Sequence, residues 1–134
     1  MKLFLDANIL FTAARTPAGK AAFVIACGGE GYWQLVTSAY AVEEARRNLE
    51  RKTPAALRQL PDLLGNFEIV VPSPAVPCPD VLPVKDRPIF QAAHTGAASH
   101  LLTGDLKDFG PLMNCPNLTF GIIIQTVAEF LKAI

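Results

Sequence analysis

Short apolar runs alternate along this chain with segments of helical pattern, and this alternation constrains the fold more than any other feature. Runs rich in Leu, Ile, Val and Phe are separated by stretches that carry helix start and stop signals such as Ser, Thr-Pro and Gly. Strands joined through helices form a parallel sheet, because each helix returns the chain to the starting edge of the sheet. We therefore expect an α/β fold, a three-layer α/β/α arrangement with a central parallel sheet of about five strands.

These patterns also place the individual elements. The expected strands span residues 3–5, 34–37, 67–71, 100–103 and 118–123. The expected helices span residues 18–27, 39–52 behind Ser38, 54–64, 86–98 and 126–134. Residues 72–83 hold five prolines, which exclude a helix or an interior strand and predict an extended surface arm. All of these elements fit one domain that spans residues 1–134.

The composition favours association with other molecules. Hydrophobic residues make up 51% of the chain and charged residues only 18%, below the roughly 25% typical of soluble domains. A surface with surplus apolar area is explained by a homodimer or a partner protein, and a core rich in alanine is the other explanation. The net charge is zero, so nucleic-acid binding would depend on local basic residues rather than on an overall positive potential.

The cysteines and the N-terminus indicate a cytoplasmic protein. Cys27, Cys78 and Cys115 are widely spaced and form no Cys-x-x-Cys motif, which excludes a disulfide framework or a zinc site and suits a reducing compartment. The apolar N-terminal segment is too short for a signal peptide, and Asp6 interrupts it. No stretch approaches 18 uninterrupted apolar residues. We therefore expect a soluble protein that does not associate with a membrane.

Acidic residues are expected to gather at one edge of the sheet. Asp6 follows the first expected strand and Asp105 comes two residues after the fourth, while Asp86 opens the helix that leads into the fourth strand. Glu44 lies in the helix that follows the second strand, and Asp108 comes shortly after Asp105. Ligands of open parallel sheets bind beyond the carboxyl ends of the strands. Clustered carboxylates repel one another unless a hard divalent cation neutralises them, so this pattern indicates metal-dependent phosphodiester chemistry.

Each acid also has a structural interpretation. Asp86 is equally placed to cap its helix, and Asp108 to cap the turn before Phe109. Glu44 alone would be an ordinary solvated helix residue. Burying Asp6 at the end of an apolar strand is costly unless its carboxylate is paired, bound to a metal, or bonded to the backbone amides that follow.

Helix geometry separates Glu44 from its neighbour Glu43. Ala41, Ala45 and Leu49 define the apolar stripe of the helix, and Glu44 lies nearer the flank of this stripe than Glu43 does. A residue at that margin can turn into a cleft, whereas one opposite the stripe faces water. Glu44 is therefore the preferred ligand, although the geometry does not exclude Glu43.

At this point the residues resemble a known family. The segments FLDANIL, TSAYAVEEARRNL, DRPIFQAAHTGAASHLLTGD and TGDLKDF together look like a PIN-domain nuclease. The resemblance covers roughly residues 3–130 and is to the small stand-alone PIN proteins, which include VapC-type toxins of toxin–antitoxin modules. The first motif is weak alone, but the ordered set is fairly specific.

The resemblance implies a function and a set of site residues. It implies hydrolysis of single-stranded RNA at a Mg²⁺ or Mn²⁺ site, and an antitoxin as the partner that holds toxin members inactive. The residues to which it assigns metal binding are Asp6, Glu44, Asp86 and Asp105. Asp108 becomes an accessory acid, and Asn8 and Thr103 match positions that orient the acids by hydrogen bonding.

The basic residues after Glu44 are candidates for RNA binding. We hypothesise that Arg47 and Arg51 track the RNA backbone, whereas the alternative is that this run of charges only makes ion pairs along the helix. The proline arm and the even charge balance depart from the family pattern. We therefore expect a modest affinity for RNA, and a structured RNA or one delivered by a partner is an alternative substrate.

Two other functions compete with the nuclease. A haloacid-dehalogenase-like phosphatase also has an aspartate after its first strand, but it needs a second aspartate two residues later, where this chain has Asn8. Its terminal acids are also usually spaced more widely than Asp105 and Asp108. The second alternative is a PIN-like interaction module that has lost the chemistry, which the presence of all the acids disfavours.

Overall fold

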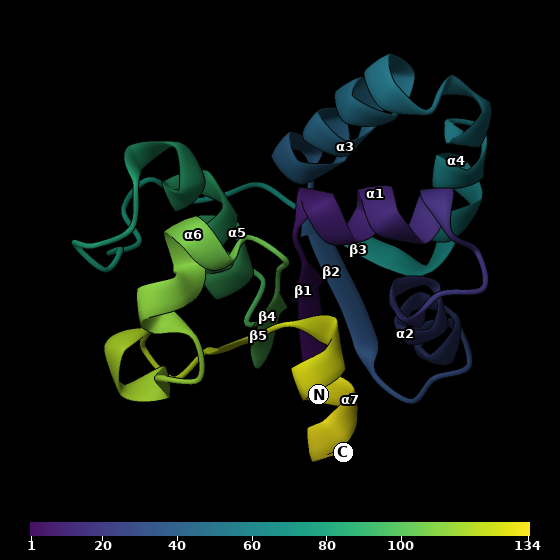
Figure 1. Cartoon of the computed structure of the whole chain (residues 1–134). Coiled ribbons are helices and arrows are strands. Elements are labelled where there is room, and N and C mark those ends of the chain that lie inside the picture. The colour runs from purple at the N-terminus through teal and green to yellow at the C-terminus, as the bar shows by residue number, and fades with distance from the viewer.

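The computed structural model describes residues 1–134 and shows a five-stranded parallel sheet flanked by seven α-helices (Figure 1). The strands are β1 (Lys2–Leu5), β2 (Gln34–Ser38), β3 (Phe67–Val70), β4 (His100–Leu102) and β5 (Ile123–Gln125). Their order across the sheet is β3-β2-β1-β4-β5, and every neighbouring pair is parallel. The expected α/β fold with about five parallel strands is confirmed.

The helices cover both faces of the sheet. They are α1 (Ala7–Arg15), α2 (Lys20–Gly29), α3 (Ala39–Lys52), α4 (Gln59–Leu63), α5 (Arg87–Thr95), α6 (Leu106–Phe109) and α7 (Val127–Ala133). In Figure 1, α1, α2 and α4 lie on one side of the strands and α5 and α6 on the other. This division follows from right-handed crossovers, because the chain moves outward from β1 to β3 and then returns past β1 to β4.

The core explains why the first strand is continuously apolar. Leu3, Phe4 and Leu5 are all fully buried, since β1 is the central strand and both of its faces are covered by helices. The arm of residues 72–83 contains no helix or strand, as its prolines predict, and Leu82 anchors it in the core. No single helix is long and apolar enough to cross a membrane; α1 and α2 reach that length and hydropathy only together, and they are bent by 98° at their junction.

Two helices were not predicted, and two expected elements were wrong in detail. The first helix of the structure, α1, begins directly after β1 and was not predicted, and the short helix α6 was also missed. The last strand was expected at residues 118–123 but is β5, Ile123–Gln125. Phe120 and Gly121 have positive φ angles of 53° and 89°, so the chain turns there instead of extending. Helix α5 ends at Thr95, before Gly96, rather than at residue 98.

Gly28 offers a test of how tightly α2 packs on the sheet. A Cβ atom at Gly28 would lie 2.4 Å from Leu35 Cδ1, whereas one at Gly65 would meet nothing within 4 Å. We expect Gly28→Ala to lower the free energy of unfolding by about 1–3 kcal/mol, because overpacking a buried contact forces side chains from their rotamers. Gly65→Ala serves as the control and should be close to neutral. Urea unfolding of both variants measures the difference, and equal stabilities would contradict this packing.

Candidate metal centre

The candidate site lies where the strand order reverses. After β1 the chain crosses toward β2, and after β4 it crosses toward β5, so the two connections diverge between neighbouring strands. Crevices at such a switch point, beyond the carboxyl ends of the strands, are the usual ligand sites of open α/β sheets. Asp6 follows β1 here, and Thr103 and Asp105 follow β4. The fold therefore brings together side chains that are almost 100 positions apart in the sequence.

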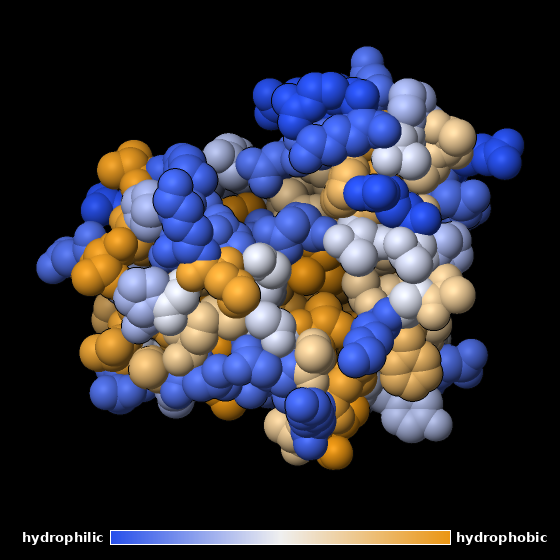
Figure 2. Space-filling model, viewed as in Figure 1, coloured by the Kyte–Doolittle hydropathy of each residue, from blue (hydrophilic) through white to orange (hydrophobic).

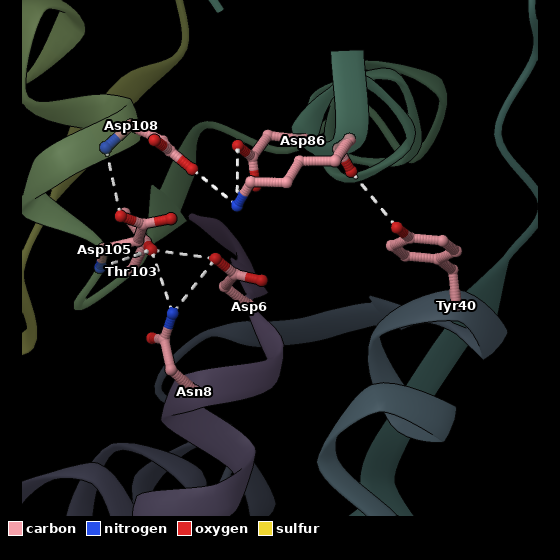
Figure 3. Close-up of polar contacts among 8 residues, drawn as sticks. Asp6, Asn8, Tyr40, Asp86, Thr103, Asp105 and Asp108 are labelled. Carbon is pink, nitrogen blue, oxygen red and sulfur yellow. Dashed lines mark hydrogen bonds and ion pairs between the residues drawn. The ribbon is translucent and has the colours of Figure 1, made fainter. Parts of the chain in front are cut away.

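Asp6 is held from several directions (Figure 3). Its Oδ1 accepts a hydrogen bond from the backbone N–H of Ala7 at 2.7 Å, and its Oδ2 accepts one from the Thr103 hydroxyl at 2.8 Å. The first bond caps α1, so the backbone-amide interpretation of this buried aspartate describes one of its two oxygens. Burial raises the pKa of Asp6 to about 6 although these bonds lower it, and repulsion from Glu44 and Asp105 adds to the increase.

Asn8 and Thr103 connect the two strand ends. The Asn8 side chain donates to Asp6 Oδ2 at 3.3 Å and accepts from the backbone N–H of Gly104 at 2.7 Å. The Thr103 hydroxyl accepts from the backbone N–H of Asp105 at 3.1 Å. These bonds fix the loop after β4 against the start of α1. Both residues therefore bond to acids of the site, and their role in orienting these acids stays a prediction of the family resemblance.

Asp86, Asp105 and Asp108 form the tightest group of acids. Each offers one carboxylate oxygen, and these three oxygens all lie within 4.8 Å of one another. Asp105 Oδ1 accepts the backbone N–H of Asp108 at 3.0 Å and so caps α6. Asp86 stands at the start of α5, but its side chain makes no capping hydrogen bond, so the capping interpretation of this residue was wrong.

The hydrogen bonding and the charges of this group of acids suit a bound cation. Asp86 Oδ2 is buried and has no hydrogen-bond partner. Burial raises the pKa of Asp86 to about 7, and its hydrogen bond with Asp108 and repulsion from the other acids contribute further. This oxygen could act as a ligand of a divalent cation, and the charge of the cation would offset the repulsion that raises the pKa of Asp86. The side chains present therefore fit a hard metal ion.

Lys85 and Tyr40 are two residues of the site that sequence reasoning missed. The Lys85 ammonium lies 2.7 Å from Asp108 Oδ2 and 3.7 Å from Asp86 Oδ2, and it lowers the pKa of Asp108. The Tyr40 hydroxyl, from the first turn of α3, donates to the backbone oxygen of Lys85 at 3.1 Å. Only the position of Lys85 next to Asp86 in the sequence signalled its role. Asp108 binds Lys85 through its side chain rather than capping a turn.

The two glutamates of α3 have different surroundings. Glu43 pairs with Arg46 at 2.6 Å and lies 3.7 Å from Arg47. Glu44 makes no ion pair, and it is close enough to Asp6 to raise the pKa of that residue. Glu44 is exposed, and neither it nor Asp6 belongs to the group of acids within 4.8 Å. The structure thus leaves Glu44 available to a cation at the edge of the centre.

The basic residues of α3 divide into two kinds. Arg46 bridges Glu43 and Glu50 along the helix, as the ion-pair interpretation predicts. Arg47 is 68% exposed in its side chain and has only the longer contact with Glu43, while Arg51 donates to Asn48 Oδ1 at 3.1 Å. Arg47 and Arg51 therefore keep most of their donors free for a ligand.

Comparisons with known proteins bear on the fold. No family model matches the sequence, and no curated protein does either. The structure is similar to VapBC2 from Rickettsia felis, with a TM-score of 0.64 and 15% sequence identity over 94% of this chain and 98% of that chain. That crystal structure contains VapBC2 bound to a DNA fragment from its own promoter. It is also similar to VapBC-1 from nontypeable Haemophilus influenzae, with a TM-score of 0.58 and 16% identity over 96% of this chain and 99% of that one. The chain has the PIN-domain fold.

The PIN fold accounts for the position of the acids. The similarity extends over nearly the whole chain, so it includes the strand order that creates the crevice beside β1 and β4. Identities of 15% and 16% establish the architecture alone. The structural similarity does not support the phosphatase alternative. The residue two positions after Asp6 is Asn8 rather than an aspartate, and its side-chain oxygen accepts the backbone N–H of Gly104.

Proposed function

We propose that this PIN-fold protein is a metal-dependent endoribonuclease that hydrolyses phosphodiester bonds of single-stranded RNA. The observation that carries the proposal is the group formed by Asp86, Asp105 and Asp108 at the switch point of the sheet, with a buried oxygen of Asp86 that accepts no hydrogen bond. Acids clustered without a structural role for all of their oxygens are typical of metal-dependent phosphodiesterases.

The residues that would hold the metal come from four parts of the chain. They are Asp6, Glu44, Asp86 and Asp105, with Asp108 as an accessory acid. When bound, Mg²⁺ or Mn²⁺ would supply a Lewis acid that activates water and stabilises negative charge on the phosphate. The protein's own contribution is positional: Thr103 holds Asp6 through its hydroxyl, and Asp105 is fixed by its cap on α6. Such fixed ligands need no reorganisation when the reaction occurs.

The RNA would approach along α3. Arg47 and Arg51 are exposed one turn apart on this helix, beyond Glu44. Their guanidinium groups would bind phosphates of the RNA backbone. Since the net charge of the chain is zero, we expect modest affinity for RNA. A structured RNA with an accessible loop would meet the same requirement as a single strand.

The surface favours protein partners. Large apolar side chains that are more than half exposed include Val71, Val81, Val84, Leu106 and Phe120. Figure 2 shows apolar residues gathered over the part of the molecule that contains the arm, α5 and α6. The two similar structures are of VapBC. We propose that this protein likewise binds a cognate antitoxin, that it forms a homodimer, and that it works in the cytoplasm.

Cleavage of labelled RNA tests the proposed function. Purified protein should cut a single-stranded RNA in Mg²⁺ or Mn²⁺ and should stop when a chelator removes the ion. Binding of the same RNA without cleavage in either metal would leave the non-catalytic interaction module as the better interpretation. Hydrolysis of an aryl phosphate in place of RNA would instead favour the phosphatase.

The two glutamates of α3 provide a matched pair of variants. We expect Glu44→Gln to lower the rate of RNA cleavage by about a hundredfold, because it removes a negative charge beside Asp6. Glu43→Gln removes the same charge one position earlier, where it only pairs with Arg46 and Arg47, and should change the rate less than about twofold. Single-turnover rates at saturating Mn²⁺ decide between them. The reverse order would assign the metal to Glu43.

A further inference from the structure

The acids of the centre already hold a cation of the protein itself. The Lys85 ammonium lies 2.7 Å from Asp108 Oδ2 and 3.7 Å from Asp86 Oδ2 (Figure 3). No other lysine or arginine pairs with the acids of the site. We propose that Lys85 permanently occupies one of two cation positions, so that the centre binds a single divalent ion and uses the ammonium in place of a second. This inference rests on the proposed nuclease function.

The peptide unit that joins Lys85 to Asp86 is held at both of its polar atoms. The Tyr40 hydroxyl donates to the backbone oxygen of Lys85, and the backbone N–H of Asp86 donates to the oxygen of Pro83 at 3.0 Å. Pro88 then stands in the first turn of α5, where its ring restricts the chain further. The side chain of Lys85 is 70% exposed along its length, but its attachment point cannot move away from the acids. The ammonium therefore stays within reach of Asp86 and Asp108.

The position of the ammonium conflicts with a second metal ion. In two-metal centres the ions lie about 3.5–4 Å apart and share carboxylate ligands. A second ion shared between Asp86 and Asp108 would need the oxygens that face Lys85, at a distance where two cations repel strongly. The acids on the other side of Asp105, which are Asp6 and Glu44, remain free of any basic side chain. The residues that would hold the single divalent ion are therefore Asp6, Glu44, Asp86 and Asp105.

Lys85 has a direct task in such a centre. An ammonium is a compact charge with three donors, so it can bind a nonbridging oxygen of the phosphate that is attacked. It would neutralise charge there as a second ion does, without taking or giving a proton. The rate of cleavage would then rise with the first power of the Mn²⁺ concentration, because only one ion has to bind.

Calorimetric titration with Mn²⁺ alone tests the inference. We expect wild type to bind one Mn²⁺ per chain and Lys85→Met to bind two, since methionine removes the charge from a chain of similar length. Lys85→Arg keeps the charge and should bind one. Lys107→Met is the matched control, because Lys107 is an exposed lysine of the adjacent helix α6 that pairs with no acid, and it should also bind one.

The stoichiometries decide the outcome. Two ions in wild type, or one in Lys85→Met, would overturn the inference and leave the nuclease proposal intact. No Mn²⁺ bound by wild type would overturn both. One ion in wild type and two in Lys85→Met, without cleavage of RNA by either protein, would uphold the cation position and refute the nuclease. In an active wild type, we expect Lys85→Met to cleave RNA about a hundredfold more slowly at the Mn²⁺ concentration that saturates wild type, with recovery at higher concentrations.

Discussion

Asp105→Asn is expected to lower RNA cleavage by roughly a thousandfold or more, which corresponds to roughly 4 kcal/mol of transition-state stabilisation. The variant removes one negative charge from the centre of the acidic group, where Asp105 lies between Asp108 and Asp6. Asparagine caps a helix as well as aspartate does, so its oxygen can still accept the backbone N–H of Asp108. The loss of activity should therefore occur in a folded protein.

The measurement combines kinetics with a fold control. Single-turnover cleavage in Mn²⁺ gives the rates, and thermal unfolding in a chelator should show a midpoint within a few degrees of wild type. Asp62→Asn, an exposed aspartate of α4 outside the centre, is the matched control and should cleave like wild type. Full activity in Asp105→Asn would refute the assignment of the metal to this group.

Asp86→Asn is expected to stabilise the metal-free protein while it weakens metal binding. Asp86 carries a buried oxygen that accepts no hydrogen bond, and its pKa is raised to about 7 from an ordinary value of 3.8. The folded state therefore binds more protons than the unfolded state between about pH 4 and 7, and the stability of wild type falls as the pH rises through this range. Asp86→Asn has no carboxyl group at this position, so its stability should not fall in this way as the pH rises. It should be more stable than wild type at pH 8 and nearly equal to it at pH 4.

Bound metal should make wild type more stable than Asp86→Asn. Mn²⁺ at 100 times its dissociation constant would stabilise wild type by about 2.7 kcal/mol, and the variant, which has lost a ligand, should gain much less. Urea unfolding at pH 4, 6 and 8, with chelator or with Mn²⁺, measures both effects. Asp80→Asn, an exposed residue of the arm, is the control for a lost charge. A variant less stable than wild type in the chelator at pH 8 would show that Asp86 has a structural role instead.

Much of the architecture could be predicted because local pattern and global fold agree. The alternation of apolar runs and helix signals implied the parallel sheet, and strand ends placed Asp6 and Asp105 at one edge. Helix α1 was missed because its apolar sequence follows directly on that of β1, with Asp6 alone between them. Its start signal is Asp6 itself, which caps the helix through the same carboxylate that we had assigned to the metal. Because Asp6 had been interpreted as a metal ligand, its second role as a helix cap was overlooked.

The remaining details depend on contacts that no short motif records. Lys85 entered the site because the backbone turn at residues Val84–Asp86 and the Tyr40 hydroxyl direct it there, from segments 45 positions apart. The choice between Glu43 and Glu44 rested on helix geometry, and the structure adds that Arg46 engages the first and leaves the second free. The position of β5 followed from the left-handed backbone at Phe120, which a bulky residue rarely adopts.

The helix caps at the centre have a consequence for the choice of ion. Asp6 and Asp105 each use one oxygen to bind a backbone N–H, which leaves fewer lone pairs for bidentate binding of a metal. Ca²⁺ takes six to eight oxygen ligands and often needs bidentate carboxylates to reach that coordination number. Mg²⁺ is smaller, prefers an octahedron and retains several waters. The helix caps therefore favour Mg²⁺ over Ca²⁺, because Mg²⁺ needs fewer oxygen ligands from the protein and keeps several waters.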